Sequence, residues 1–252
     1  MTLSTAQWHQ RYQQQAQWTH DLRCYIYDRV DLSRAKKILD VGCGTGALEV
    51  ELSQLSTGEI YALDIEPQHI IYASQFAPAA IYTLGDGLRL PYPAASFDIT
   101  LCHFFLLWVR NAGQVLDEFS RVTRPGGYVL ALAEPDYGGR IDYPPELSAL
   151  GNWQCEALRN QGASPFIGRQ LGQLFSIAGL TEIEVGVLGA QWHKNASEEE
   201  LDLEWQVIRS DLAHKPDFIT QSEKLYAIDK TSRQSHFRIL YVPTFYAFGK
   251  LK

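Results

Sequence analysis

Three aspartates each stand at or just after the end of a short apolar run, a place where carboxylates often recognise ligands. Asp40 lies two residues before a glycine-rich turn that opens at Gly42. Asp64 closes the second run, and Asp86 sits in a Gly-Asp-Gly sequence after the third. A carboxylate at such a place can accept hydrogen bonds from ribose hydroxyls or from an adenine amino group, and it attracts cationic groups. The three residues together predict a site for a nucleotide-like ligand.

The glycine-rich turn itself leaves two ligands open. Within KILDVGCGTGALEVEL, residues 37–52, Gly42, Gly44 and Ala47 form a G-x-G-x-x-A pattern that also fits the NAD fingerprint. Glycines here allow a left-handed backbone and close approach of a ligand, and the following helix N-terminus favours a negative group. The carboxylate of Asp40 would repel a pyrophosphate and attract the ammonium and sulfonium of S-adenosylmethionine. Asp64 fits either ligand.

The elements that position these residues alternate between strand and helix. We expect strands at 36–41, 59–64, 80–84, 97–102 and 128–134, and helices at 47–55, 67–76 and 112–122. Such alternation predicts a doubly wound parallel α/β sheet.

The two ends of the chain carry further elements. Residues 8–30 are predicted to be helical, and 135–165 to be a long loop with one helix at 146–159. Then follow a helix at 168–179, a strand at 182–192, a helix at 197–213 that opens with a capping box, a helix from Pro216, and an aromatic strand at 237–248.

Composition narrows the class of protein. The chain has 252 residues, 46% of them hydrophobic, and a net charge of −7, which disfavours general binding to a nucleic-acid backbone. The four cysteines are widely spaced, which predicts reduced thiols and a cytoplasmic protein. The N-terminus is polar, unlike a signal peptide, and the longest apolar run, 99–109, is too short for stable membrane insertion. No cluster has metal-ligand spacing, so we predict no metal.

Four motifs in order carry a family resemblance. LDVGCGTG, YALDIEP, LGDGLRLPYPAASFDIT and VTRPGGYVLALAEP resemble the class I S-adenosylmethionine-dependent methyltransferases, in particular the branch with ubiquinone- and menaquinone-biosynthesis enzymes and many small-molecule methyltransferases. The resemblance covers about residues 36–135. It implies a Rossmann-like seven-stranded sheet whose antiparallel last strand, 237–248, lies beside 182–192.

The same resemblance implies a role for each matching residue. The methionine part of the cofactor would lie on Asp40, Gly42, Cys43 and Gly44, the ribose on Asp64, and the adenine between Ile65 and Leu88 with Asp86 and Gly87 at its amino group. His103 would face the methyl donor.

Acceptor-side residues follow from position rather than motif. His103, just past a central strand, suits a general base, although a packing role is the alternative. Glu134, Asp136 or Tyr137 could orient the acceptor, and the aromatic faces of Tyr12 and Trp18 could cap the sulfonium or simply pack on the sheet.

The expected domain organisation is a helical cap, 1–35, followed by a methyltransferase domain, 36–252. Insertions at 135–166 and 193–236 would form an acceptor lid or, alternatively, cover the back of the sheet. A lid would line the acceptor pocket with Tyr137, Arg140, Tyr143, Trp153 and Trp205.

The predicted function is S-adenosylmethionine-dependent methyl transfer to a small-molecule acceptor. The alternative is a methyltransferase-like protein that binds the cofactor or regulates a partner without turnover.

Overall fold

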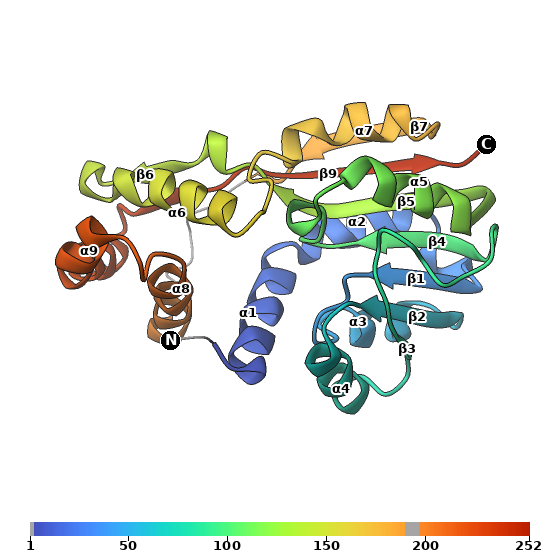
Figure 1. Cartoon of the computed structure of the whole chain (residues 1–252), viewed down its shortest axis with the longest axis horizontal. Helices are drawn as coiled ribbons and strands as arrows, with labels where there is room; N and C mark the ends of the chain where they lie inside the picture. The colour runs from blue at the N-terminus through green and yellow to red at the C-terminus, as the bar shows by residue number, and fades with distance from the viewer. Residues whose placement is uncertain (1–2, 190–196) are drawn as a thin grey trace.

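The computed structural model describes residues 3–189 and 197–252, and its centre is a seven-stranded sheet. The strand order is β3-β2-β1-β4-β5-β9-β7 (Figure 1). Strands β1 to β5 are parallel, and β9 is antiparallel to both β5 and β7. The predicted α/β fold with a reversed last strand is therefore confirmed. The bounds are β1 Lys37–Val41, β2 Glu59–Asp64, β3 Ile81–Leu84, β4 Phe97–Cys102, β5 Thr123–Pro135, β7 Thr181–Val187 and β9 Thr244–Lys250.

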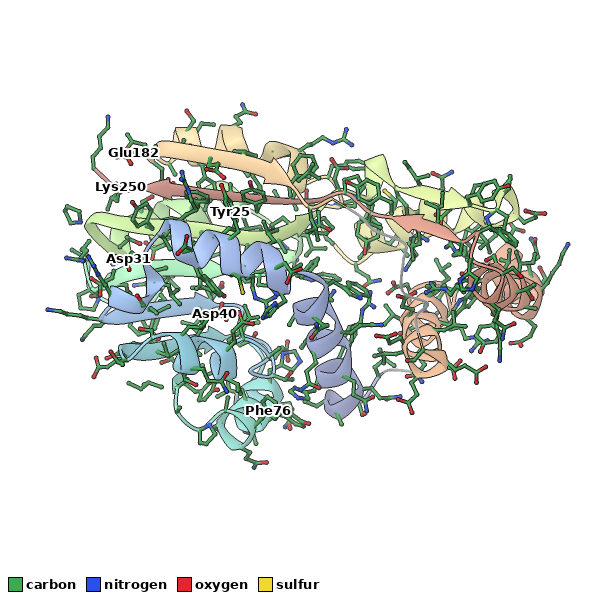
Figure 2. All side chains as sticks on the ribbon, turned by 180° about the vertical axis from the view of Figure 1, so that it is seen from behind. Tyr25, Asp31, Asp40, Phe76, Glu182 and Lys250 are labelled. Atoms are coloured by element: carbon green, nitrogen blue, oxygen red, sulfur yellow. The ribbon has the colours of Figure 1, made fainter. Side chains whose placement is uncertain are left out.

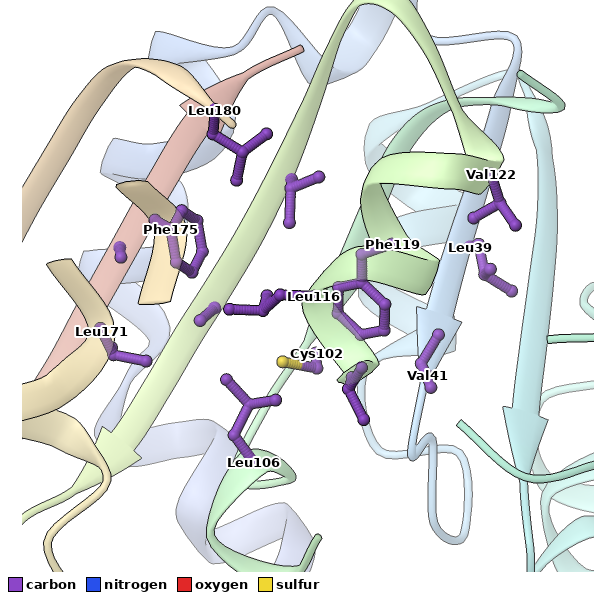
Figure 3. Packing of buried hydrophobic residues seen from close by; sticks show 14 of the residues in the cluster. Leu39, Val41, Cys102, Leu106, Leu116, Phe119, Val122, Leu171, Phe175 and Leu180 are labelled. Atoms are coloured by element: carbon purple, nitrogen blue, oxygen red, sulfur yellow. The ribbon is translucent and has the colours of Figure 1, made fainter. Parts of the chain in front are cut away.

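Helices cover both faces of this sheet because its strands are apolar on both sides. Helices α5 and α7 bury one face in a cluster that includes Phe119 and Phe175 (Figure 3). Helices α2 and α3 bury the other face in a cluster that includes Ile26 and Leu52. Strand β1 supplies both clusters, with Leu39 on one face and its neighbour Ile38 on the other. The helices are α2 His20–Arg29, α3 Glu49–Leu55, α4 Pro67–Phe76, α5 Ala112–Val122 and α7 Leu171–Ile177.

The predicted N-terminal helix is two helices. Helix α1, Thr5–Trp18, starts with a capping box between Ser4 and Gln7 and ends at Thr19, where α2 begins in a new direction. Helix α2 lies on the sheet, whereas α1 extends beyond the sheet toward the helices of the C-terminal third (Figure 1).

Those helices form an accessory unit beside the sheet. It consists of α6 Ser148–Asn160, α8 Glu198–Asp211, α9 Pro216–Gln234 and a two-stranded sheet of β6 Ile141–Tyr143 and β8 Ile239–Tyr241. Its core contains the predicted apolar face of α8, namely Leu201, Trp205, Ile208 and Leu212. The capping box of Ser197 and Glu200 is also confirmed. The accessory unit packs against α1 and stands beyond the end of the main sheet (Figure 1).

The prediction of one strand at 237–248 is wrong. The chain leaves the accessory unit after β8 and enters the main sheet as β9, with Val242 and Pro243 between them. Proline has no N–H for a strand ladder, and the carbonyl of Pro243 instead accepts a hydrogen bond from the N–H of Asp136 at 2.7 Å. Residues 239–250 therefore contribute one strand to each of the two sheets.

A buried charge network stabilises the accessory unit. The carboxylate of Asp229 accepts hydrogen bonds from Nε1 of Trp205 at 2.7 Å, from Nε of Arg238 at 2.6 Å and from Nε of Arg233 at 3.1 Å. Arg238 also donates to Asp142 at 2.8 Å. Because every buried charge here has an opposite partner, the network fixes α8 and α9 relative to the small sheet.

Candidate functional site

One large cavity lies where the carboxyl ends of β1, β2 and β4 meet α1 and the accessory unit. Its volume is about 1920 Å³. Asp40, at the end of the sheet near α1 (Figure 2), lines this cavity together with Asp64, Asp86 and His103. The strand order changes direction between β1 and β4, which is where open α/β sheets bind ligands.

The glycine turn after β1 is closed by hydrogen bonds within the protein. Gly42, Gly44 and Gly46 have φ of 79°, 54° and 84°, a region that favours glycine. The N–H groups of Gly42 and Cys43 donate to the carbonyl of Leu63 at 2.7 and 3.1 Å, and that of Gly46 donates to Cys43. These three N–H groups are therefore used within the protein.

Two aromatic side chains occupy the space that the glycines leave open. A Cβ on Gly42 would lie 2.3 Å from the ring of Phe105, and one on Gly87 would lie 2.7 Å from the same ring. A Cβ on Gly44 would lie 3.0 Å from the ring of Tyr12. These glycines therefore allow the rings of Phe105 and Tyr12 to pack closely against the backbone. Nothing in the sequence pointed to this role of Phe105.

Asp64 joins the end of β2 to the glycine turn. Its Oδ2 accepts the N–H of Gly44 at 2.8 Å, and its Oδ1 accepts the N–H of Glu66 at 2.9 Å. Burial alone would raise the pKa of Asp64, but His69 and the two N–H donors lower that pKa below its usual value. The group is therefore ionised at neutral pH.

Asp40 behaves in the opposite way. It is 2% exposed, and burial raises its pKa to about 7. The neighbouring Glu49 is 1% exposed, and burial together with Asp40 raises the pKa of Glu49 well above its usual value. Oδ1 of Asp40 and both carboxyl oxygens of Glu49 have no hydrogen-bond partner in residues 3–189 and 197–252. A cationic group would relieve this cost.

The turn after β3 supplies a third carboxylate. Oδ1 of Asp86 accepts the N–H of Leu88 at 2.9 Å, which orders the Gly-Asp-Gly turn. Gly87 and Leu88 line the cavity, and so does Ile65, which is 61% exposed. Exposed apolar side chains on the wall of a cavity offer a surface for a flat, apolar ligand group.

His103 is anchored on the joint between the N-terminal helices. Its Nε2 lies 2.8 Å from Oγ1 of Thr19, which also accepts a hydrogen bond from Nη1 of Arg23 at 2.6 Å. Arg23 in turn pairs with Glu51 at 2.6 Å. Burial, aided by the charge of Arg23, lowers the pKa of His103 well below its usual value, so the ring is neutral at physiological pH. Thr19 and Arg23 gave no signal of this role in the sequence.

The accessory unit forms the far wall of the cavity. Tyr137, Arg140 and Trp153 line it as expected. The guanidinium of Arg140 is paired with Asp142 at 2.6 Å and is only 5% exposed, so it is committed to the protein.

Two expected acceptor residues are not in this wall. Trp205 is fully buried in the core of the accessory unit, where its indole N–H binds Asp229. Tyr143 is 47% exposed and packs on Phe237 outside the cavity. Both are aromatic residues on predicted insertions, but only the tertiary fold determines which face of each element meets the cavity.

Two acidic residues, one near the end of β5 and one just after it, also have structural roles. Glu134 is fully buried, and its carboxylate accepts the N–H groups of Phe105, Leu106 and Leu107 at 2.8 to 3.1 Å. It thereby fixes the loop that carries Phe105. Asp136 is 2% exposed and forms an ion pair with Arg169. Neither lines the cavity, so orientation of the acceptor by these two is not supported.

The N-terminal aromatics lie at different depths. Tyr12 covers the glycine turn, and Trp18 lines the cavity with 44% of its surface exposed. Within residues 3–189 and 197–252, no group of three or more His, Cys, Asp or Glu side chains could hold a metal ion. The same part of the chain has no helix long and apolar enough to span a membrane.

Comparisons with known proteins agree with this geometry. Residues 39–131 match the family model described as a methyltransferase domain. The malonyl-[acyl-carrier protein] O-methyltransferase of Yersinia pestis is 40% identical over 99 residues, covering 38% of this chain and 37% of that protein. The demethylmenaquinone methyltransferase of Deinococcus radiodurans is 37% identical over 120 residues, covering 46% of each. The chain thus matches less than half the length of either relative.

The fold has a counterpart among solved structures. The YcgJ protein of Bacillus subtilis superimposes with a TM-score of 0.60 at 18% identity, covering 92% of this chain and 99% of that one. This likeness concerns the fold alone. Residues 39–131 therefore carry a methyltransferase domain, and the strand order and strand-end motifs are those that the class I S-adenosylmethionine-dependent methyltransferases lead one to expect.

Proposed function

We propose that this protein transfers the methyl group of S-adenosylmethionine to a small-molecule acceptor. The observation that carries the proposal is the single cavity, which is lined by the three strand-end aspartates and His103 on one side and by aromatic residues of the accessory unit on the other. A cofactor and an acceptor bound there would share one enclosed space.

The roles proposed for the cofactor residues follow their surroundings. A carboxylate can accept about four hydrogen bonds, and each oxygen of Asp64 accepts one backbone N–H, with Nδ1 of His69 lying 3.5 Å from Oδ1, so acceptor positions remain for the two ribose hydroxyls. The adenine would lie between Ile65 and Leu88 with its amino group on Asp86, and the methionine part would lie along residues 40–44, including Cys43.

The same surroundings disfavour a dinucleotide. A pyrophosphate needs N–H groups at the turn, but those of Gly42, Cys43, Gly44 and Gly46 are already used. The buried carboxyl group of Asp40, which lines the cavity and whose Oδ1 lacks a partner among the described residues, instead favours a cation such as the α-ammonium of S-adenosylmethionine.

The methyl group of this cofactor is already activated, so the protein has mainly to align acceptor and donor and exclude water. We propose that residues 1–35, of which 3–35 are described, form a cap, with Tyr12 over the cofactor and Trp18 on the neighbouring face of α1, between the cofactor and the acceptor. Residues 135–166 and 197–236 would form a lid that closes the acceptor side of the domain 36–252, with Tyr137, Arg140 and Trp153 near the acceptor; the first four residues of the expected insertion 193–236 lie outside the described residues. The two relatives described above are named for different acceptors. We propose that the choice of acceptor depends on the cavity wall that Tyr137, Arg140 and Trp153 form.

The four free cysteines, two of them buried, suit a protein in the reducing cytoplasm.

The direct test is transfer of label from S-[methyl-³H]adenosylmethionine to a metabolite extract. We expect a labelled small molecule, micromolar binding of S-adenosylhomocysteine and no binding of NADH by calorimetry. Asp64→Ala should weaken S-adenosylhomocysteine binding about ten- to a hundredfold, because a charged acceptor is lost. Tight cofactor binding without transfer to any acceptor would favour the non-catalytic alternative, and binding of NADH would contradict the cofactor assignment.

Cofactor affinity should rise with pH. The α-ammonium prefers ionised Asp40, whose pKa in the free protein is raised to about 7 by burial. Below pH 7 binding must first expel a proton, so the affinity for S-adenosylhomocysteine should be about tenfold lower at pH 6 than at pH 8. Asp64 stays ionised and His103 stays neutral over this range because the pKa of each is lowered. Titration calorimetry should show this slope in the wild type and a flat profile in Asp40→Asn; equal slopes would refute the role of Asp40.

His103 is proposed as the general base. His103→Gln should lower kcat at least about a hundredfold while the cofactor dissociation constant changes less than about twofold. Because the pKa of His103 is lowered by burial, the acid limb of the pH–rate profile should lie below the usual histidine range and vanish in the variant. An unchanged kcat would leave His103 with a packing role only.

A further inference from the structure

Arg11 of α1 lines the cavity between α1 and the accessory unit, and the proposed transfer chemistry does not use it. Its guanidinium carbon lies 4.6 Å from the centre of the Trp18 ring, and its Nη1 donates to Oε1 of Gln14 at 2.6 Å. Both partners belong to α1, so the helix itself holds this cation in position. A guanidinium has five N–H donors, and most of those of Arg11 remain available.

The charge of Arg11 is not neutralised by an ion pair. Within residues 3–189 and 197–252, no carboxylate oxygen lies within 4.0 Å of its guanidinium nitrogens. Four other arginines line the same cavity, and three of them differ in this respect, whereas Arg110, also without an ion pair among the described residues, is exposed to solvent. Arg140, Arg233 and Arg238 each form an ion pair of 2.6 Å with an aspartate or a glutamate.

The acids of α8 that act on Arg11 from across the cavity have other partners. Glu204 accepts a hydrogen bond from Arg233 at 2.6 Å, and Asp211 accepts hydrogen bonds from two glutamine side chains at 3.3 and 3.4 Å. Burial lowers the pKa of Arg11, and Glu204, Tyr137 and Asp211 offset that effect only in part. A partly desolvated cation in this state gains from a bound anion.

We infer that Arg11 binds a carboxylate of the methyl acceptor, so that the substrates are small carboxylic acids with an aromatic or apolar body. This inference rests on the proposed function. The planar guanidinium, held over the Trp18 ring, can donate two parallel hydrogen bonds to a carboxylate. Tyr137 and Trp153 line the same cavity and would contact the body of the acid.

The cofactor also carries a carboxylate, but Arg11 lies on a different face of α1. Tyr12 and Thr19, seven residues apart, face the glycine turn and His103. Arg11, Gln14 and Trp18 share the neighbouring face, and Gln14 donates to the carbonyl of Glu200 at the start of α8 at 3.5 Å. Arg11 is therefore directed to the accessory unit, the acceptor side.

The test is calorimetry on protein saturated with S-adenosylhomocysteine. Hexanoate, benzoate and indole-3-acetate are titrated beside their amides, which have the same shape without the charge. At least one acid should bind more tightly than its amide. Arg11→Gln should lose about tenfold or more of the affinity for that acid, whereas its affinity for the amide should not change. Arg11→Lys should retain part of the preference, and Arg34→Gln, at an exposed surface position, should behave as the wild type.

Two results would overturn the assignment. One is that the wild type binds no acid more tightly than its amide, or that Arg11→Gln keeps the preference. The other is that Arg11→Gln weakens S-adenosylhomocysteine tenfold but leaves 5′-methylthioadenosine, which lacks the carboxylate, unchanged; Arg11 would then serve the cofactor. Binding of S-adenosylhomocysteine and transfer of the labelled methyl group are measured in separate experiments. A failure of the proposed function is therefore distinguished from a failure of the assignment of Arg11.

Discussion

The carboxylate of Asp64 is the interaction on which the arrangement of the cavity depends. It ties the end of β2 to the N–H of Gly44 and to its own turn at Glu66, so that the ends of two neighbouring parallel strands keep a fixed separation. With its pKa lowered by His69 and these donors, Asp64 stays charged, whereas burial raises the pKa of Asp40, on the adjacent strand, to about 7, so that Asp40 is partly protonated at neutral pH. The edge of the cavity at the ends of β1 and β2 therefore carries one carboxylate that is always charged, Asp64, and one that becomes charged when a cation binds, Asp40. This pair suits a ligand with both hydroxyl and ammonium groups.

A second buried carboxylate, that of Glu134, stabilises the loops around this edge of the cavity. Glu134 gathers three consecutive N–H groups of the loop after β4 and thereby seats Phe105 against Gly42 and Gly87. The glycine turn, the turn after β3 and the loop that carries His103 are consequently packed on one ring. Substitution of Glu134 would disturb all three, although the residue itself does not line the cavity.

The sequence predicted the sheet well because its signals are local. The first four apolar runs, the proline at the start of α4 and the capping box of α8 agree with the structure to within one or two residues, whereas β5 begins at Thr123 rather than at 128 and β7 ends at Val187 rather than at 192. The strand-end aspartates lie at one cavity because parallel strands end at one edge. Long-range partners left no such signal. Trp205 has the same aromatic character as Trp153, yet it meets Asp229 inside the accessory unit, and Glu134 differs from an acceptor-binding acid only in the loop that folds over it. The break between β8 and β9 was predictable in part from Pro243, but the change of sheet was not.

We propose that one S-adenosylmethionine molecule spans the ends of β1, β2 and β3, with its methyl group turned to the accessory unit. A crystal structure of the complex with S-adenosylhomocysteine tests this most directly. We predict the ribose hydroxyls on Asp64, the adenine between Ile65 and Leu88 with its amino group at Asp86, and the α-ammonium near Asp40. A complex in which S-adenosylhomocysteine lies elsewhere, or in which its ribose makes no contact with Asp64, would contradict the account.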